Sequence, residues 1–312
     1  PAYCTPPTIY FLTRMPSPKI IFQAFEEVKP SLIVAVPLII EKIIKKSVLP
    51  KLETPAMKIL LKVPIINDKI KATVREEMIK AFGGNFKAVI VGGAAFNQEV
   101  EQFLKMIDFP YTVGYGMTEC GPIICYEDWR RFKPGSCGKA VPRMDVQVLS
   151  SDPENIVGEL HVKGDNIMLG YYKNNEATEN AFKDGWLNTG DLAVMDKDNF
   201  IYLKGRSKNM ILGPSGQNIY PEEIEGKLNN MPFVSESIVI EKEGKLIALV
   251  YPDFENAGKE NITQKNIEIQ MEENRIALNK ELPAYSQISQ INIHYEEFEK
   301  TPKRSIKRYL YQ

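Results

Sequence analysis

Apolar and polar positions in the first part of the chain follow the period of a helix and then that of a strand. Ser17 followed by Pro18 is typical of a helix start, and apolar residues from Ile20 to Val28 recur at the spacing of one helical face. The continuous apolar run Leu32–Val36 predicts a strand that is buried on both faces. A helix is therefore followed directly by a strand.

The alternation then repeats. A helix from about Leu38 and a longer helical region ending at Gly83 precede a strand at 86–91. Asn97 begins the next helix as its cap, and a short strand follows at 111–113. Alternating strands and helices predict an α/β fold in which helices flank a parallel sheet.

Two glycine-bearing segments, Gly92–Phe96 and Gly114–Glu119, each directly follow one of these predicted strands. Ligands of open parallel sheets bind at the carboxyl ends of the strands, so both segments are expected to face the same crevice. A glycine on either side of Tyr115 lets the backbone approach a flat ligand while the ring offers a stacking face. The alternative is a tight turn around a buried tyrosine.

Beyond Gly121 the pattern changes to short alternating strands at 144–149, 158–164 and 200–205. A third pattern follows, with a helix from Pro221, strands near 237–240 and 246–251, a polar linker at 255–261, a helix from about Thr263 and a strand near 288–293. We therefore predict part of a large domain at 1–207, with the α/β sheet to about residue 120 and a β-rich subdomain at about 121–207. A small mobile α+β domain is predicted at 208–312.

The composition is that of a globular protein, with 44% hydrophobic and 25% charged residues in a chain of 312, enough for more than one core. A formal net charge of −1 gives no bias towards nucleic acid, and we expect no such partner. The longest apolar run, Leu32–Ile40, is interrupted by Pro37 and is far shorter than the ~20 residues that cross a bilayer. We expect no membrane span and leave peripheral membrane association open.

The four cysteines show no metal-binding or disulfide pattern: there is no Cys-x-x-Cys pair among Cys4, Cys120, Cys125 and Cys137. We expect reduced thiols and a cytoplasmic protein. The chain opens on Pro1 with neither a start methionine nor a signal-peptide pattern, so we expect it to be a piece of a longer protein.

Hydroxyl, carboxylate and guanidinium groups supply the candidate chemistry. Thr118 could bind a phosphoryl oxygen and Glu119 could hold Mg²⁺. Asp191, in a Thr-Gly-Asp turn, could accept both hydroxyls of a ribose that Arg206 braces. For each of these residues taken singly, an ordinary turn or surface residue is the better interpretation. His161, His294, Trp129 and Trp186 are expected to be structural or surface residues.

The order and spacing of several motifs are more specific than any single residue. "GGAA", "YGMTE", "GELHVKGDNIMLGYYKNNEAT", "DGWLNTGD" and "GRSKNMI" followed by "GQNIYPEEIE" together resemble the adenylate-forming acyl-CoA synthetase and ligase superfamily of AMP-binding enzymes. The segment "FLTRMPSPKIIFQAFEEVKPSLIVAVPLIIEKI" is most similar to the bacterial long-chain fatty-acid CoA ligases.

The resemblance implies an acid-thiol ligase that uses ATP, Mg²⁺ and CoA to activate a fatty acid to acyl-AMP and then form the thioester. Gly93, Ala94 and Ala95 would line adenine, with Tyr115 stacked on it beside Gly116 and Met117. Thr118 would touch phosphate, Glu119 would hold the metal, and Asp191 and Arg206 would bind ribose. Lys208 would be the hinge and Gly216 would lie on the loop presented to CoA.

Two departures from the family pattern qualify this reading. The Ser/Thr/Gly-rich phosphate loop is absent from the sequence, so we expect this chain alone to have little or no adenylation activity. Ser305 stands where the family has its adenylation lysine, and Lys307, or else Lys303, is the candidate replacement if the segment is extended. An acyl-AMP ligase that loads a carrier protein and a non-catalytic nucleotide-binding module remain the alternatives.

Overall fold

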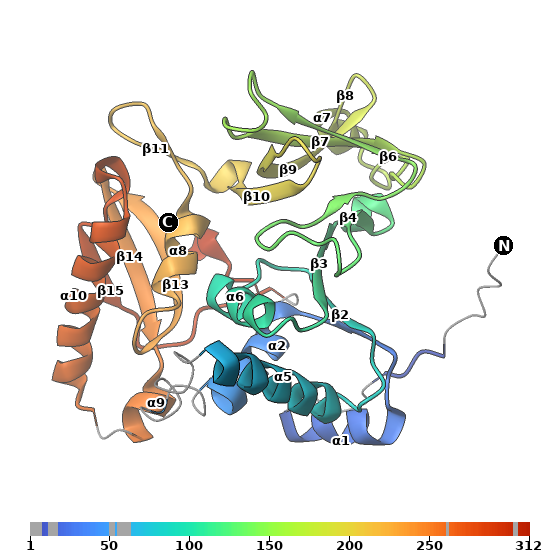
Figure 1. Cartoon of the computed structure of the whole chain (residues 1–312). Coiled ribbons are helices and arrows are strands. Elements are labelled where there is room, and N and C mark those ends of the chain that lie inside the picture. Colours follow the sequence, from blue (N-terminus) through green and yellow to red (C-terminus); the bar gives the residue numbers. More distant parts are fainter. Residues whose placement is uncertain (1–7, 12–17, 50–53, 55–63, 260–261, 302–304) are drawn as a thin grey trace. The chain divides into compact units, whose positions relative to one another are not determined.

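The computed structural model describes residues 8–11, 18–49, 54, 64–259, 262–301 and 305–312. The chain divides into two compact units (Figure 1). Unit 1 comprises Pro1–Gly116 and Tyr126–Gly138, and unit 2 comprises Met117–Cys125 and Lys139–Gln312. The fold is α/β, as the sequence predicts, with a parallel sheet and flanking helices followed by β-rich and α+β parts.

Unit 1 is built on three parallel strands in the order β1-β2-β3. Four α-helices accompany them in the described residues, and the second continues as a π-helical turn. The elements are α1 (Pro18–Val28), β1 (Leu32–Ala35), α2 (Pro37–Ile43) with its turn η1 (Ile44–Val48), α5 (Pro64–Ala81), β2 (Ala88–Gly92), α6 (Gln98–Met106) and β3 (Tyr111–Gly116). The predicted cap Ser17 lies outside the described residues, whereas Asn97 caps α6 by accepting a hydrogen bond from Val100 N–H.

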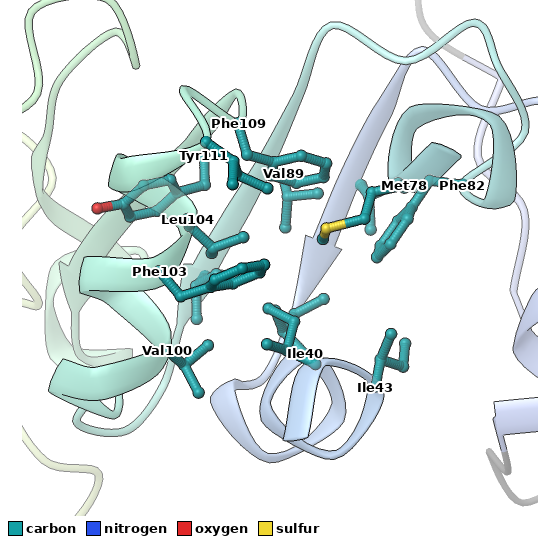
Figure 2. Close-up of a cluster of buried hydrophobic side chains, with 14 of the residues drawn as sticks. Ile40, Ile43, Met78, Phe82, Val89, Val100, Phe103, Leu104, Phe109 and Tyr111 are labelled. Atoms are coloured by element: carbon teal, nitrogen blue, oxygen red, sulfur yellow. The ribbon is translucent and has the colours of Figure 1, made fainter. Parts of the chain in front are cut away.

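The core of unit 1 forms where apolar faces of the helices meet the sheet. Figure 2 shows side chains from α2, α5 and α6 converging on Val89 of β2. Phe82 is 1% exposed and stacks on Phe25, with 5.3 Å between the ring centroids. Since burying a side chain of this size stabilises a fold by roughly 1.5 to 3 kcal/mol, this aromatic cluster helps to fix the helices on the sheet.

The first strand departs from prediction, because only one of its faces is buried. Ile33 is 7% exposed, but Leu32 and Val34 are 51% and 74% exposed. Alternate residues of a strand point to opposite faces, so the described core covers the Ile33 face alone. The prediction that the apolar run Leu32–Val36 forms a strand buried on both faces is therefore wrong for the described residues.

Unit 2 begins with the short turn η2 (Thr118–Cys120) and contains an antiparallel sheet in the order β10-β9-β7-β6. Its elements in this part are β4 (Ile123–Tyr126), β5 (Lys139–Ala140), β6 (Met144–Leu149), β7 (Gly158–Gly164), α7 (Asn175–Ala181), β8 (Phe182–Lys183), β9 (Trp186–Met195) and β10 (Ile201–Arg206). The alternating apolar pattern thus predicted both β6 and β7 correctly.

The rest of unit 2 has the predicted α+β character, with a three-stranded sheet in the order β13-β14-β15. Buried residues of α8 and α10 form one cluster with strands β13 and β14. The elements are η3 (Ser207–Asn209), β11 (Ile211–Leu212), β12 (Asn218–Ile219), α8 (Pro221–Leu228), β13 (Val234–Lys242), β14 (Lys245–Pro252), α9 (Phe254–Lys259), α10 (Gln264–Glu281), η4 (Ala284–Ser286), β15 (Gln290–Ile293) and η5 (Arg308–Leu310).

The predicted polar linker at 255–261 is wrong for residues 255–259, which belong to helix α9, and its last two residues lie outside the described residues. Asp253 caps this helix by accepting a hydrogen bond from Asn256 N–H at 3.1 Å, and Ala257 is 2% exposed. A local cap and one buried contact therefore offset the weak helical propensity of a polar segment.

Among the described residues, no helix combines the length and apolar character required to cross a membrane.

Candidate functional site

The loop after β2 and the end of β3 lie at the same edge of the parallel sheet in unit 1. Gly92 pairs with Gly114, so Gly93 and Tyr115 each follow at the carboxyl end of their strand. Gly93 has a φ of +92°, and a Cβ added there would meet nothing within 4 Å. The conformation favours glycine, and the space above the backbone can admit a flat ligand.

The glycines around Tyr115 do not form the turn that the sequence suggested. Gly114, Tyr115 and Gly116 are the last residues of β3, so they are extended. Ala94 and Ala95 are exposed, and Tyr115 is half-buried. Unit 1 thus brings together the three small residues and the ring that the resemblance assigns to adenine. Met117–Cys125, which follow directly in the sequence, belong to unit 2.

Thr118 and Glu119 lie on the 3₁₀ turn η2, where the loop after β7 holds the backbone. Met168 N–H donates to Glu119 O at 2.7 Å. The hydroxyl of Tyr171 donates to Glu119 Oε1 at 2.9 Å. Thr118 is exposed, and its hydroxyl is therefore accessible from solvent. The turn presents one hydroxyl and one oriented carboxylate.

This donor set suits a cation that takes most of its ligands from a substrate. The described residues contain no group of three or more His, Cys, Asp or Glu side chains arranged to hold a metal ion. Mg²⁺ commonly binds through one or two carboxylates together with phosphate oxygens and water, so Glu119 fits that role. The neighbouring thiol of Cys120 is buried, and burial and Glu119 raise its pKa to about 11, which makes it a poor nucleophile.

Asp191 and Arg206 meet directly across the β9–β10 pair. The distance between Asp191 Oδ1 and Arg206 Nε is 2.8 Å, with the aspartate side chain 11% and the arginine side chain 52% exposed. Asp191 N–H donates to Thr189 Oγ1 at 3.1 Å, which fixes the backbone before the carboxylate. Thr189, Gly190 and Asp191 lie within strand β9, so the turn expected here from the sequence is not formed. The sequence placed both residues at one site, and the structure joins them as an ion pair.

A cavity of about 290 Å³ opens beside this pair. Its volume is at the low end of small-molecule sites, which are about 300 to 1,000 Å³, so it suits a sugar better than a whole nucleotide. Its walls come from β7, β9, β10 and the turn η3, and their surface is more apolar than polar although the lining residues carry polar groups. The lining residues are Glu159, Asn188, Gly190, Arg206, Ser207 and Lys208.

Lys208 is exposed at the centre of the turn η3, between two residues that are tied to different elements. Ser207 Oγ donates to Glu159 Oε1 on β7 at 3.0 Å. Asn209 Nδ2 donates to Glu222 Oε1 on α8 at 2.7 Å. Rotation at Lys208 would keep both of these contacts, but it would separate Lys204 on β10 from Glu223 on α8, whose side chains lie 2.8 Å apart.

Gly216 lies at the tip of a hairpin between β11 and β12. Its φ is +81°, and a Cβ added there would meet nothing within 4 Å. Gly216 N–H donates to Gly213 O at 2.9 Å, which closes the turn. The residue is therefore on an open loop of the α+β part.

The C-terminal segment reverses direction between Lys300 and Ile306. The prediction that Lys303 or Lys307 replaces the lysine expected at Ser305 assumed an extended segment. Lys300 and Ile306 form an antiparallel bridge, and Thr301 N–H donates to Ser305 O at 2.8 Å. Lys303 lies outside the described residues. Lys307 Nζ is 3.1 Å from Glu299 Oε2, and this contact raises the pKa of Lys307 and keeps it charged.

Arg308, next to Lys307, anchors this segment in the small core. Its guanidinium contacts Glu225 Oε2, and its Nη1 donates to Val239 O at 3.3 Å. Glu225 Oε1 accepts a hydrogen bond from Val239 N–H at 2.6 Å. Breaking a buried ion pair that is also hydrogen-bonded costs stability, so this contact holds Arg308 in place. It thereby fixes the backbone position of the neighbouring Lys307.

The histidines and tryptophans that were expected to be structural or surface residues contact neighbouring side chains or strands. His161 is 3% exposed within β7, and His294 stacks on Phe298 with 4.8 Å between ring centroids. The guanidinium of Arg130 lies over Trp129 at 5.1 Å, and Trp186 pairs with Lys183 in the β8–β9 hairpin. His161 Nε2 also lies 3.6 Å from Glu159 Oε2.

Sequence reasoning missed the partners of the candidate residues. Tyr171 contacts Glu119, Glu159 holds Ser207, and Glu225 holds Arg308. The tyrosine follows a glycine in "LGYYKNNEAT", but nothing in that pattern indicates a contact with a residue 52 positions earlier. Glu225 lies in a helix whose charged residues resemble a solvated face.

The chain belongs to the AMP-binding enzyme family, whose sequence profile matches residues 6–172, more than half of the chain. A second profile, described as the AMP-binding enzyme C-terminal domain, matches residues 208–311. Both findings confirm the resemblance carried by the motifs.

Curated relatives are long-chain-fatty-acid–CoA ligases. FadD15 of Mycobacterium bovis is 32% identical over 167 residues, which are 54% of this chain and 27% of that protein. The Escherichia coli O6:H1 enzyme is 40% identical over 151 residues, 46% of this chain and 27% of the relative. The Yersinia pestis enzyme is 43% identical over 132 residues, 41% of this chain and 23% of the relative. The matched residues thus span about a quarter of each relative.

Solved structures show the same fold. O-succinylbenzoate coenzyme A synthetase (MenE) from Bacillus subtilis, in complex with AMP, has a TM-score of 0.69 at 20% identity and covers 95% of this chain. ATP-bound MatB from Rhodopseudomonas palustris has a TM-score of 0.69 at 21% identity and covers 96%. In both comparisons the chain spans 53% of the solved structure's length.

Proposed function

We propose that this chain serves the ATP-dependent activation of a long-chain fatty acid and its transfer to CoA. A carboxylate oxygen of the acid attacks the α-phosphorus of ATP, and pyrophosphate leaves. The sulfur of CoA then attacks the acyl carbon, and AMP leaves with the carboxylate oxygen. The observation that carries the proposal is the ion pair of Asp191 and Arg206 beside a cavity of about 290 Å³.

The ribose of the nucleotide would occupy this cavity. A carboxylate can accept hydrogen bonds from both ribose hydroxyls, and a guanidinium can brace the sugar or its phosphate. The ion pair supports this role because Arg206 holds the Asp191 carboxylate at 2.8 Å before any ligand arrives. Preorganised groups lose less conformational freedom on binding, and affinity rises accordingly.

The adenine base would lie at the carboxyl edge of the unit 1 sheet. Gly93, Ala94 and Ala95 would line one side of it, and Tyr115 would stack on its face beside Gly116 and Met117. The open space above Gly93 and the exposure of Ala94 and Ala95 support close approach of a flat ring. An aromatic ring over a base adds dispersion and stacking energy.

Thr118 and Glu119 would act on the phosphates. Mg²⁺, held by Glu119 and by phosphate oxygens, would neutralise negative charge on the triphosphate. The exposed hydroxyl of Thr118 would donate a hydrogen bond to a phosphate oxygen. Phosphoryl transfer depends mainly on position and charge, so these two residues would contribute by orientation.

The C-terminal part would provide the remaining groups and change position between the steps. Lys307, with Lys303 as the reserve candidate, would stabilise charge during adenylation. Lys208 would be the hinge between 1–207 and 208–312, and the start of the matched C-terminal domain at residue 208 supports that boundary. Gly216 would lie on the loop presented to CoA.

The acid and the compartment are inferred from relatives and from cysteine chemistry. All three curated relatives named above are long-chain-fatty-acid–CoA ligases, which supports a long acyl chain and CoA as acceptor. Cys120, Cys125 and Cys137 are buried thiols outside disulfides, which supports a reducing compartment such as the cytoplasm.

A thioester assay tests the acceptor and the acid together. The complete protein that contains this chain is incubated with ATP, Mg²⁺ and CoA and with fatty acids of short, medium and long chain, and acyl-CoA is measured by mass spectrometry. We expect acyl-CoA from the long-chain acids. Accumulation of acyl-AMP without acyl-CoA would favour an acyl-AMP ligase that uses a carrier protein.

A further inference from the structure

The hydroxyl of Tyr171 and the carboxylate of Glu119 form a contact between two parts of unit 2 that are 52 positions apart. The hydroxyl donates to Glu119 Oε1 at 2.9 Å. A hydrogen bond to an ionised carboxylate is shorter and stronger than one between neutral groups.

The backbone around Glu119 is held by the same loop. Met168 N–H donates to Glu119 O at 2.7 Å. Asn166 Nδ2 donates to Cys120 O at 2.6 Å and to Ile123 O at 3.0 Å. The turn η2 is therefore fixed by main-chain contacts that do not require Tyr171, and the tyrosine hydroxyl acts on the side chain alone.

Tyr171 is itself anchored. Its N–H donates to Thr178 Oγ1 at 2.9 Å, and the Thr178 hydroxyl donates to Asn174 O at 2.9 Å. Asn174 in turn caps helix α7 by accepting a hydrogen bond from Ala177 N–H at 3.0 Å. The backbone of Tyr171 is therefore held in place, which limits the positions that its hydroxyl can take beside the carboxylate.

The adjacent tyrosine provides a natural comparison. Tyr172 is 87% exposed, and the ammonium of Lys173 lies over its ring at 5.3 Å. Its hydroxyl makes none of the hydrogen bonds described for Tyr171. Tyr171→Phe and Tyr172→Phe each remove one phenol oxygen, so Tyr172→Phe is the control for losing a tyrosine hydroxyl whose described contacts do not include Glu119.

We propose that Tyr171 is a positioning residue that holds the Glu119 carboxylate in one orientation for a divalent cation. A carboxylate side chain otherwise samples several rotamers and loses that freedom when it binds a metal. Partners that orient a metal ligand contribute about 10- to 100-fold to metal affinity. The inference rests on the proposed role of Glu119 as the Mg²⁺ ligand.

Metal binding is measured directly, without turnover. Mn²⁺ serves as the probe, and its affinity for the complete protein with a non-hydrolysable ATP analogue is determined by electron paramagnetic resonance. The variants are Tyr171→Phe, Tyr172→Phe, Glu119→Gln and the double variant Tyr171→Phe/Glu119→Gln. Thermal unfolding of each variant reports whether the fold is intact.

We expect Tyr171→Phe to weaken Mn²⁺ binding about 10-fold, while Tyr172→Phe leaves it unchanged. Glu119→Gln should weaken binding at least as much, and the double variant should bind as Glu119→Gln does, because the two residues act as one unit. These results would support the inference.

Two outcomes would overturn it, and they are distinguishable. If Glu119→Gln weakens Mn²⁺ binding but Tyr171→Phe behaves as Tyr172→Phe does, or the two losses add in the double variant, Tyr171 does not position Glu119 and the proposed function stands. If Glu119→Gln leaves Mn²⁺ binding unchanged, the metal assignment within the proposed function is wrong, and the role of Tyr171 fails with it.

Discussion

Asp191 on β9 and Arg206 on β10 are directly opposite each other, and 2.8 Å separates Asp191 Oδ1 from Arg206 Nε. The aspartate is almost buried while the arginine is half exposed. The sheet thus holds an acceptor of fixed direction, and Arg206, the cation that fixes it, lines the cavity.

Asp191→Ala is predicted to weaken binding of ATP and of AMP, because both ribose hydroxyls lose their acceptor. Hydrogen bonds to a charged group contribute roughly 1.5 to 3 kcal/mol, which corresponds to about 10- to 150-fold in affinity. Isothermal titration of the complete protein with AMP measures the change. Asp145→Ala, at an exposed aspartate of β6, is the control and should bind as the parent does. An unchanged affinity in Asp191→Ala would mean that the ribose binds elsewhere.

Lys208→Pro is predicted to damage one half-reaction far more than the other. Proline restricts φ at the position where rotation is required, between the anchors Ser207 to Glu159 and Asn209 to Glu222. Acyl-AMP formation and thioester formation are measured separately in single-turnover experiments on the complete protein. Lys208→Ala, which keeps the backbone freedom, should affect both steps little. Equal losses in the two steps of Lys208→Pro would argue against a hinge.

Lys307→Ala is predicted to slow acyl-AMP formation about 10-fold or more and to affect thioester formation less. The charge of Lys307 is the group that would stabilise the developing phosphoryl charge in place of Ser305. The double variant Lys307→Ala/Lys303→Ala should be at least as slow. Lys242→Ala, at an exposed lysine of β13, serves as the matched control. If the double variant adenylates as fast as the parent, the adenylation step needs no lysine from this segment.

Glu101 is predicted to make unit 1 less stable as pH rises from about 4.5 to about 7. Burial raises the pKa of Glu101 from 4.5 to about 7, so within that window the folded state binds a proton that the unfolded state has released. The free energy of unfolding falls by about 3 kcal/mol at most across this window. Above pH 7 this contribution no longer changes.

Glu101→Gln tests this sign. Glutamine does not titrate and retains an acceptor for Gly135 N–H, which donates to Glu101 Oε2 at 2.9 Å. Chemical unfolding at pH 5 and pH 8 should show a smaller pH dependence in Glu101→Gln than in the parent. Glu99→Gln, on the same helix and far more exposed, should retain the dependence of the parent. An identical dependence in the parent and Glu101→Gln would refute the assignment.

The sequence predicted those elements whose signals are local. Strand β7 was expected at 158–164 and occupies Gly158–Gly164, because one strand period and flanking glycines suffice to define it. Helix α10 begins after Thr263, whose side chain accepts a hydrogen bond from Asn266 N–H. Helix α9 was missed because its cap and its buried alanine are visible only once the unit has folded.

The candidate site was predictable as a set of residues and unpredictable as a set of contacts. Asp191 and Arg206 were singled out from separate motifs, but the register that makes them opposite depends on the bulge between Leu203 and Gly205. The contact of Tyr171 with Glu119 depends on how a loop folds over a turn, for which sequence periodicity carries no information. The antiparallel bridge between Lys300 and Ile306 was likewise not predicted, because the comparison of Lys303 and Lys307 with Ser305 assumed an extended segment.

Acid-dependent exchange of pyrophosphate into ATP tests the central claim most directly, because it requires acyl-AMP formation and nothing after it. The complete protein and the 312-residue chain are each assayed with a panel of acids from short to long chain and with an aromatic acid as control. We predict rapid exchange by the complete protein with long-chain fatty acids, and little or none by the 312-residue chain alone. Absence of exchange with every acid in the complete protein, while it still binds AMP, would contradict adenylation and leave a nucleotide-binding module in its place.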